Sequence, residues 1–169
     1  MNSKQKKQLE EWIGLKCDDI VFNSKFDNWS QDTSVFNDRI VGKKQVVFLI
    51  EDENSELFGY YYNTEVVEKY YWQETDSKSF EFNLQSKNNR LKQPMKFEIK
   101  NLQEGGIYLR EKSDDRLIWL GNICLRKEND KNYSFCQQNE NYFDYNGIKK
   151  ALCGEKYFTP KRILVIQMK

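Results

Sequence analysis

The sequence contains no histidine, the side chain that most often serves proteins as a general base and metal ligand near neutral pH. A Ser-His-Asp triad, a Cys-His pair and a zinc site built on imidazole are therefore excluded. The cysteines are also sparse, and no two of them form a C-x-x-C motif: Cys17, Cys124, Cys136 and Cys153. This pattern is typical of free thiols in a reducing compartment, although the spacing leaves a disulfide between two of them open.

Long apolar stretches are missing as well. No segment approaches the roughly 20 apolar residues that span a bilayer, and the basic start at Lys4–Lys7 lacks the apolar segment of a secretory signal. We therefore expect a cytoplasmic protein without membrane insertion. The charges balance to +1, so no broad basic field would attract a nucleic acid. Gly105-Gly106 stands outside any phosphate-binding glycine motif, and we predict no cofactor.

Aromatic residues compensate for a modest apolar fraction. Only 38% of the 169 residues are hydrophobic, but 15% are Phe, Tyr or Trp. Each large ring can bury roughly 150–250 Å², so aromatics should form much of the core. The length suits one folded unit. We predict an N-terminal helix within residues 1–16 and a single domain over residues 17–169.

Two short helices are predicted. The first has Ser3 as its N-cap and Gly14 at its stop, and its apolar positions share one face: Leu9, Trp12 and Ile13. That face suits either the covering of a sheet, which we favour, or docking into a partner groove. The second helix should span residues 32–41, with Asp32 or Thr33 as its N-cap.

Most other segments have the apolar pattern of strands. Phe80, Phe82 and Leu84 alternate with polar residues, whereas Val46–Ile50 and Ile163–Ile166 are apolar throughout and suit central strands. Further strands are expected over residues 20–24, 57–62, 96–100, 108–110, 117–120, 122–126 and 133–135. Polar turns connect them. We predict a mainly β (α+β) fold, an antiparallel two-sheet β-sandwich flanked by a few short helices.

No catalytic or metal-binding constellation emerges. The acidic turn at Glu51–Glu53, together with Glu56, lacks the spacing of a calcium loop and indicates a solvated hairpin. Cys136 is the candidate redox thiol, with Cys17 and Cys153 as further possibilities, although a strand cysteine more often packs as a small apolar residue.

Interaction residues are suggested by clustered aromatic and basic side chains. In the Tyr60–Tyr62 triplet, Tyr61 faces opposite to its neighbours, so one side of the strand could be accessible. Trp72 follows two tyrosines, and Lys149-Lys150 forms a basic pair. Tyrosine and tryptophan are enriched at protein interfaces. Core or rim packing is the competing interpretation for the aromatics, as plain solvation is for the lysines. The candidate interaction residues are Tyr61, Trp72, Lys149 and Lys150.

The order of these segments resembles the TLDc domain of oxidation-resistance proteins. The matching segments are Val21–Ser24, Thr33–Phe36, Val46–Asp52, Phe58–Tyr60, Phe80–Leu84, Ile118–Leu125 and Ser134–Cys136. Two features differ from the family pattern. Its glycine-rich stretch is reduced to Gly105-Gly106, and its L-E-V-W-G ending is replaced by Ile163–Met168.

The resemblance implies a β-sandwich, a role in oxidative-stress resistance and no established catalytic centre. It also implies binding to the vacuolar proton-pumping ATPase (V-ATPase) and regulation of that pump through the domain surface. Two alternatives are a β-sandwich that binds a ligand through its tyrosines and a thiol-based protein that reacts with peroxide.

Overall fold

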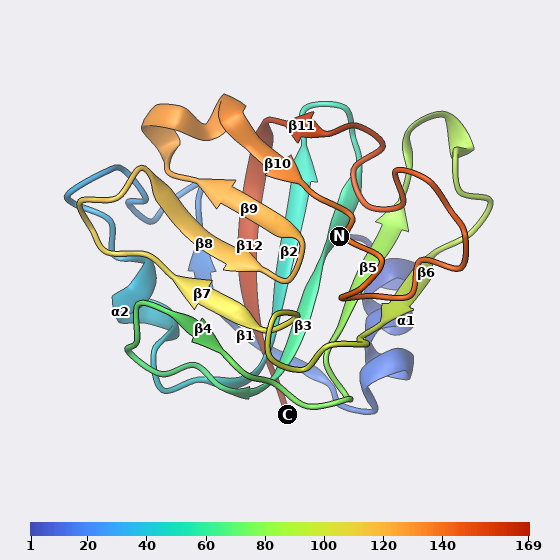
Figure 1. The fold of residues 1–169 in the computed structure, drawn as a ribbon, viewed down its shortest axis with the longest axis horizontal. Coiled ribbons are helices and arrows are strands. Elements are labelled where there is room, and N and C mark those ends of the chain that lie inside the picture. The colour runs from blue at the N-terminus through green and yellow to red at the C-terminus, as the bar shows by residue number, and fades with distance from the viewer.

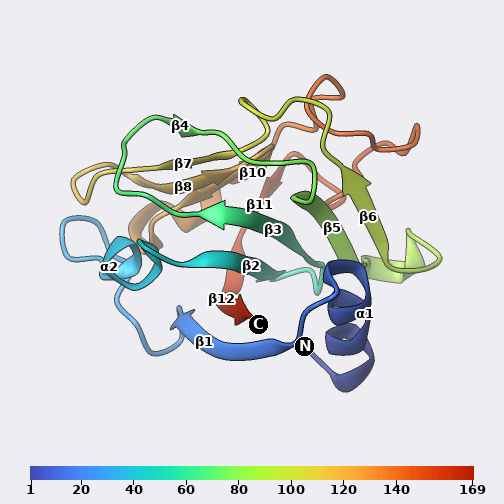
Figure 2. The same ribbon diagram turned by 90° about the horizontal axis from the view of Figure 1, so that it is seen from below.

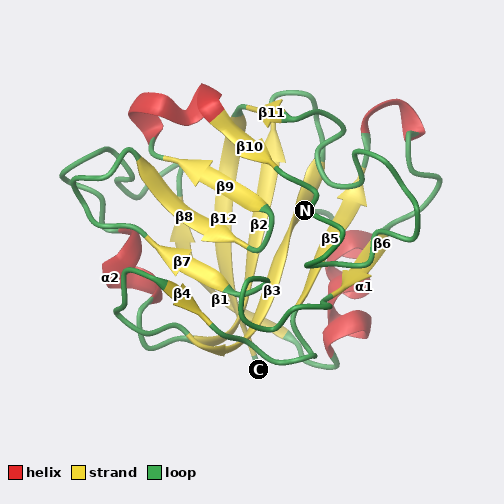
Figure 3. Cartoon of the chain, in the orientation of Figure 1, coloured by secondary structure: helices red, strands yellow, loops and turns green.

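Alternating apolar residues place twelve strands in two antiparallel sheets, as the computed structural model of residues 1–169 shows (Figure 1, Figure 3). The order in the first sheet is β1 (Cys17–Asn23), β12 (Pro160–Met168), β2 (Lys44–Asp52), β3 (Leu57–Glu65), β5 (Phe80–Gln85) and β6 (Met95–Glu98). The order in the second is β11 (Tyr157–Phe158), β10 (Ser134–Cys136), β9 (Ile123–Arg126), β8 (Arg116–Leu120), β7 (Ile107–Leu109) and β4 (Trp72–Gln73). The predicted two-sheet sandwich is confirmed.

The helices are short and lie at the margins. They are α1 (Ser3–Ile13), α2 (Phe36–Ile40) and the 3₁₀ turns η1 (Lys87–Asn89) and η2 (Glu128–Tyr133). The structure contains no helix with the length and apolar character needed to traverse a bilayer. The regular structure is therefore dominated by strands, as predicted.

The predicted first helix is confirmed, with one change at its start. Asn2, not Ser3, is the N-cap, and its side chain accepts a hydrogen bond from the Gln5 backbone. Gly14 ends the helix in the left-handed conformation with φ 77°. The second helix is shorter than predicted and has no side-chain cap. The Thr33 hydroxyl instead contacts the Asn28 side chain, and Asp32 adopts φ 66°.

Helix α1 forms a third layer, on the outer face of the first sheet (Figure 2). Because side chains alternate along a strand, β2 directs Val46, Phe48 and Ile50 between the sheets and Val47 and Leu49 towards α1. Strands β2 and β12 are thus apolar on both sides because both faces are covered, as predicted.

In an ordinary sandwich strand the apolar side chains point towards the other sheet. In β5 they point away from it, towards α1. The apolar residues Phe80, Phe82 and Leu84 pack beneath α1. Glu81 and Asn83 are consequently buried on the face directed between the sheets. One end of the interior is therefore polar.

The acidic hairpin between β2 and β3 is solvated only in part: Glu53, Asn54 and Ser55 are exposed, as predicted, but the side chains of Asp52 and Glu56 are buried. The Asp52 carboxylate accepts hydrogen bonds from the backbone N–H groups of Asn54 and Glu56. Glu56 forms an ion pair with Arg90 at 2.9 Å and accepts a hydrogen bond from Asn83. A charge that would be costly to bury alone is thereby compensated.

Candidate functional site

A row of side chains crosses the outer face of the second sheet, one from each of its six strands. The cross-strand register aligns them in this order: Trp72, Tyr108, Trp119, Cys124, Phe135 and Tyr157. We call the five aromatic members the aromatic row. Six strands spaced about 4.8 Å apart give it a length of about 24 Å.

Neighbouring rings of the aromatic row are in contact. The centroids of Trp72 and Tyr108 are 5.8 Å apart, and those of Trp72 and Trp119 are 6.2 Å apart. Trp119 meets Phe135 edge-on at 5.2 Å, and Phe135 lies 6.1 Å from Tyr157. These separations match the favourable geometries of aromatic pairs, so the rings support one another in a continuous surface.

The aromatic row is open to solvent. Its rings are half-buried except for that of Tyr157, which is 55% exposed. No helix lies over this face, whereas α1 covers the outer face of the other sheet (Figure 2). Beneath the rings, burial raises the pKa of the Cys124 thiol to about 12. That cysteine is therefore a packing residue.

Arginines and aspartates border the aromatic row. The Arg110 guanidinium lies 4.4 Å from the Tyr108 ring centroid and also donates to Asp114. Although burial opposes it, hydrogen bonds from Arg116 and Arg110 hold the pKa of Asp114 well below its ordinary value. Asp115 pairs with Arg126. The guanidinium groups are thus fixed as a polar rim beside the apolar surface.

The predicted interaction residues do not form one site. Trp72 belongs to the aromatic row, whereas Lys149 and Lys150 are exposed in the segment between β10 and β11. The expectation of an accessible Tyr61 is wrong, because its side chain faces α1 and is 2% exposed. Burial raises its pKa to about 12, and its ring packs 5.4 Å from that of Phe80.

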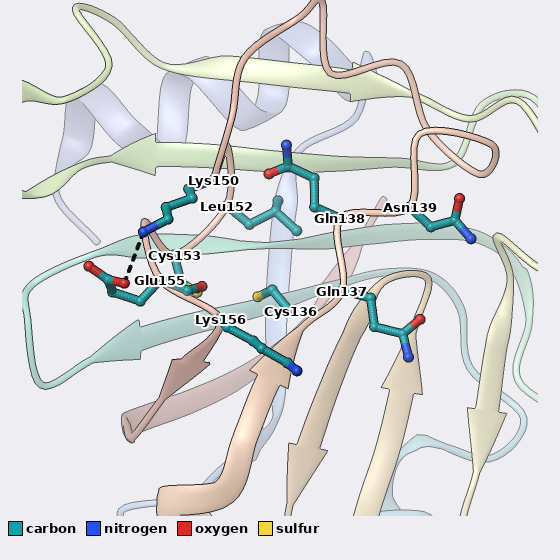
Figure 4. A pocket seen from close by; sticks show the side chains of 9 residues that line it. All are labelled: Cys136, Gln137, Gln138, Asn139, Lys150, Leu152, Cys153, Glu155 and Lys156. Carbon is teal, nitrogen blue, oxygen red and sulfur yellow. Dashed lines mark hydrogen bonds and ion pairs between the residues drawn. The ribbon is translucent and has the colours of Figure 1, made fainter.

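An open hollow of about 600 Å³ lies beside this segment (Figure 4). Its lining residues are Cys136, Gln137, Gln138, Asn139, Lys150, Leu152, Cys153, Glu155 and Lys156. The candidate thiol Cys136 and Cys153, which lies 17 residues further along the chain, both line this hollow (Figure 4). Both cysteines are candidate thiols from the sequence, but no sequence pattern indicates that they lie close together in the fold.

A second buried group, not identified from the sequence, is Glu81. Its carboxyl oxygens lie within hydrogen-bond distance of the Tyr145 hydroxyl, at 2.5 Å, and the Asn122 backbone N–H, at 2.7 Å. The Asn122 side chain donates to the same tyrosine oxygen at 2.5 Å. Burial raises the pKa of Glu81 from 4.5 to about 8. This cluster is enclosed, so it serves the interior of the protein and offers no visible substrate site.

Comparison with known proteins assigns no family to this chain. No protein-family model matches the sequence, and neither does any curated protein.

Proposed function

We propose that this protein is a non-catalytic interaction domain of the TLDc type, and that the aromatic row is its partner-binding surface. The observation that carries the proposal is an uncovered row of five rings across a whole sheet face, each in contact with at least one other ring of the row. Exposed apolar surface of this extent marks interaction sites in soluble proteins. Tryptophan, tyrosine and arginine are also the residues that dominate binding energy at interfaces.

The dimensions suit a protein partner. A row about 24 Å long, with its polar rim, can supply a large part of the roughly 800 Å² that each side of a standard interface buries. The two-sheet fold agrees with the fold that the TLDc resemblance implies. That resemblance supports the V-ATPase as the partner and oxidative-stress resistance as the wider role.

The tyrosine-based ligand site has weaker support. The Tyr60 hydroxyl donates to the Gly105 carbonyl at 2.7 Å, and the Tyr62 hydroxyl donates to that of Glu74 at 3.0 Å. Both rings are buried in the core. Their hydroxyl groups are therefore already used within the fold.

Binding to the immobilised peripheral V1 sector of the pump tests this proposal, with ATPase activity as the companion measurement. We expect a dissociation constant of about 1 μM or tighter. Replacing Tyr157 and Trp72 by alanine should weaken binding by roughly 30-fold, because each is a potential interface anchor. Phe26→Ala is the matched control, since this ring is 77% exposed and lies outside the aromatic row. Equal binding by both variants would contradict the assigned surface. Absence of binding by the folded wild-type protein would contradict the pump as partner.

A further inference from the structure

Cys136 and Cys153 meet at the wall of the hollow from separate parts of the chain. Cys136 ends β10, and Cys153 lies in the segment that leads to β11 (Figure 4). The Cys136 backbone N–H donates to the Lys156 carbonyl at 2.8 Å, which fixes the two segments together. The Cys153 thiol contacts the Glu155 carbonyl oxygen at 2.8 Å. The pair is thus held in place by backbone interactions on both sides.

The two thiols differ from the other cysteines. Cys136 and Cys153 lie close together and line the same hollow, which opens to solvent (Figure 4). Cys124 is sealed beneath the aromatic row, and Cys17 lies on β1 of the other sheet. Neither is among the residues that line the hollow. Only one pair therefore combines a neighbouring thiol with a path from solvent.

We propose that Cys136 and Cys153 form a redox-active dithiol that a hydroperoxide converts into an intramolecular disulfide. Both sulfur atoms lie at the wall of the same hollow and point towards one another (Figure 4), so a local approach would bring them to the roughly 2.05 Å of an S–S bond. Their exposures of 7% and 4% favour an oxidant as small as hydrogen peroxide over a bulky disulfide. This inference does not depend on the proposed partner binding.

Cys153 is the attacking residue. The neighbouring Cys136 thiol lowers the pKa of Cys153, although burial opposes the shift, whereas burial raises the pKa of Cys136. The Cys153 thiolate attacks one peroxide oxygen, the O–O bond breaks, and the leaving hydroxide takes a proton to become water. The product is a sulfenic acid at Cys153.

Cys136 then resolves this intermediate. Its sulfur attacks the Cys153 sulfur, the S–O bond breaks, and the departing hydroxyl leaves as a second water with the Cys136 proton. Two thiols and one peroxide thus give one disulfide and two waters. The new bond would tie β10 to a segment whose Leu152 carbonyl accepts a hydrogen bond from Asn83 of β5 at 2.6 Å. Oxidation therefore strengthens the link between the two sheets at this end.

The test treats the reduced 169-residue protein with one equivalent of hydrogen peroxide after removal of the reductant. Free thiols are titrated under denaturing conditions, and cross-linked peptides are mapped without reduction. We expect the titre to fall from the four thiols of the sequence to two, with a Cys136–Cys153 cross-link that dithiothreitol reverses. The Cys17→Ser/Cys124→Ser double variant is the matched control and should form the same cross-link at the same rate.

Single variants assign the roles of the two thiols. Cys153→Ser should slow the peroxide reaction by at least about tenfold, because it removes the attacking thiolate. Cys136→Ser should leave a Cys153 sulfenic acid that dimedone traps. An unchanged titre in the wild-type protein, or a cross-link that involves Cys17 or Cys124, would overturn the proposal. Because wild-type mapping decides this point, a variant that fails to fold does not weaken the test.

Discussion

Replacing Glu81 by glutamine should remove a large pH dependence from the stability of the protein. The Glu81 carboxyl has a pKa near 8 in the fold because it is fully buried, against 4.5 ordinarily. Between these values the unfolded chain binds fewer protons than the folded one. The free energy of unfolding therefore falls as pH rises. The stabilisation is complete below about pH 4.5 and is lost as pH approaches and passes 8.

The size of this effect follows from the shift. Each pH unit within the window costs about 1.4 kcal/mol, so the wild-type protein should lose about 2 kcal/mol between pH 6 and pH 8 through this group. For a domain of this length, that corresponds to a decrease of roughly 4–8 °C in Tm. Glutamine is neutral at both pH values. Its side chain can still accept from the Asn122 backbone and donate to the Tyr145 oxygen.

Thermal unfolding of the wild-type and Glu81→Gln proteins at pH 6 and pH 8 measures the effect. The difference in Tm between the two proteins should change by several degrees in favour of the variant at pH 8, since all other groups titrate alike in both. Glu81→Leu is a second control. It should be less stable at both pH values because it leaves the Asn122 N–H unpaired. A Tm difference that stays constant within about 1 °C would refute the assignment of a neutral, buried Glu81.

Three other substitutions test the packing of the fold, each by chemical denaturation. Trp12→Ala should cost about 2 kcal/mol, because this ring packs on Phe80 and Phe82 and holds α1 to the sheet; an unchanged midpoint would show that α1 adds nothing to stability. Gly59→Ala should cost at least about 3 kcal/mol, because its Cβ would clash with the Phe48 carbonyl oxygen. The control Gly147→Ala meets no atom within 4 Å and should cost only the strain of its φ of 73°, about 1–2 kcal/mol. Arg90→Met should cost about 3 kcal/mol by leaving the buried Glu56 charge without its partner. Adding Glu56→Gln should recover part of that loss, and no recovery would argue against the ion pair as the cause.

The main elements could be predicted because their signals are local. Alternating residues mark β5 and β6, and the continuous apolar runs mark β2 and β12 as central strands. Gly14 marks the end of α1. Strands β4 and β11 have two residues each, too few to establish a period, and were missed.

Which face of a strand meets which layer could not be predicted, because that depends on partners distant in sequence. Tyr61 and Phe80 face α1, an element at the N-terminal end of the chain and far from both residues in sequence. The same arrangement places Glu81 between the two sheets. The alternation in β5 would instead predict that the apolar residues Phe80 and Phe82 face that interior. Lys127 is another example. It lies in a predicted polar turn, yet its ammonium group is buried and donates to the carbonyls of Glu111, Lys112 and Asp114.

The two candidate sites have the same origin in long-range pairing. Trp72 and Tyr157 become members of one surface only through the pairing of six strands, and Cys136 meets Cys153 only because the intervening segment returns to the end of β10. The second sheet is apolar on its inner face and largely aromatic on its uncovered outer face. Stability alone does not require this, since polar residues on the outer face would satisfy an antiparallel sheet equally well. An uncovered aromatic face also carries a risk of aggregation. Five contacting rings on this face therefore fit the proposed binding surface better than they fit the needs of folding alone.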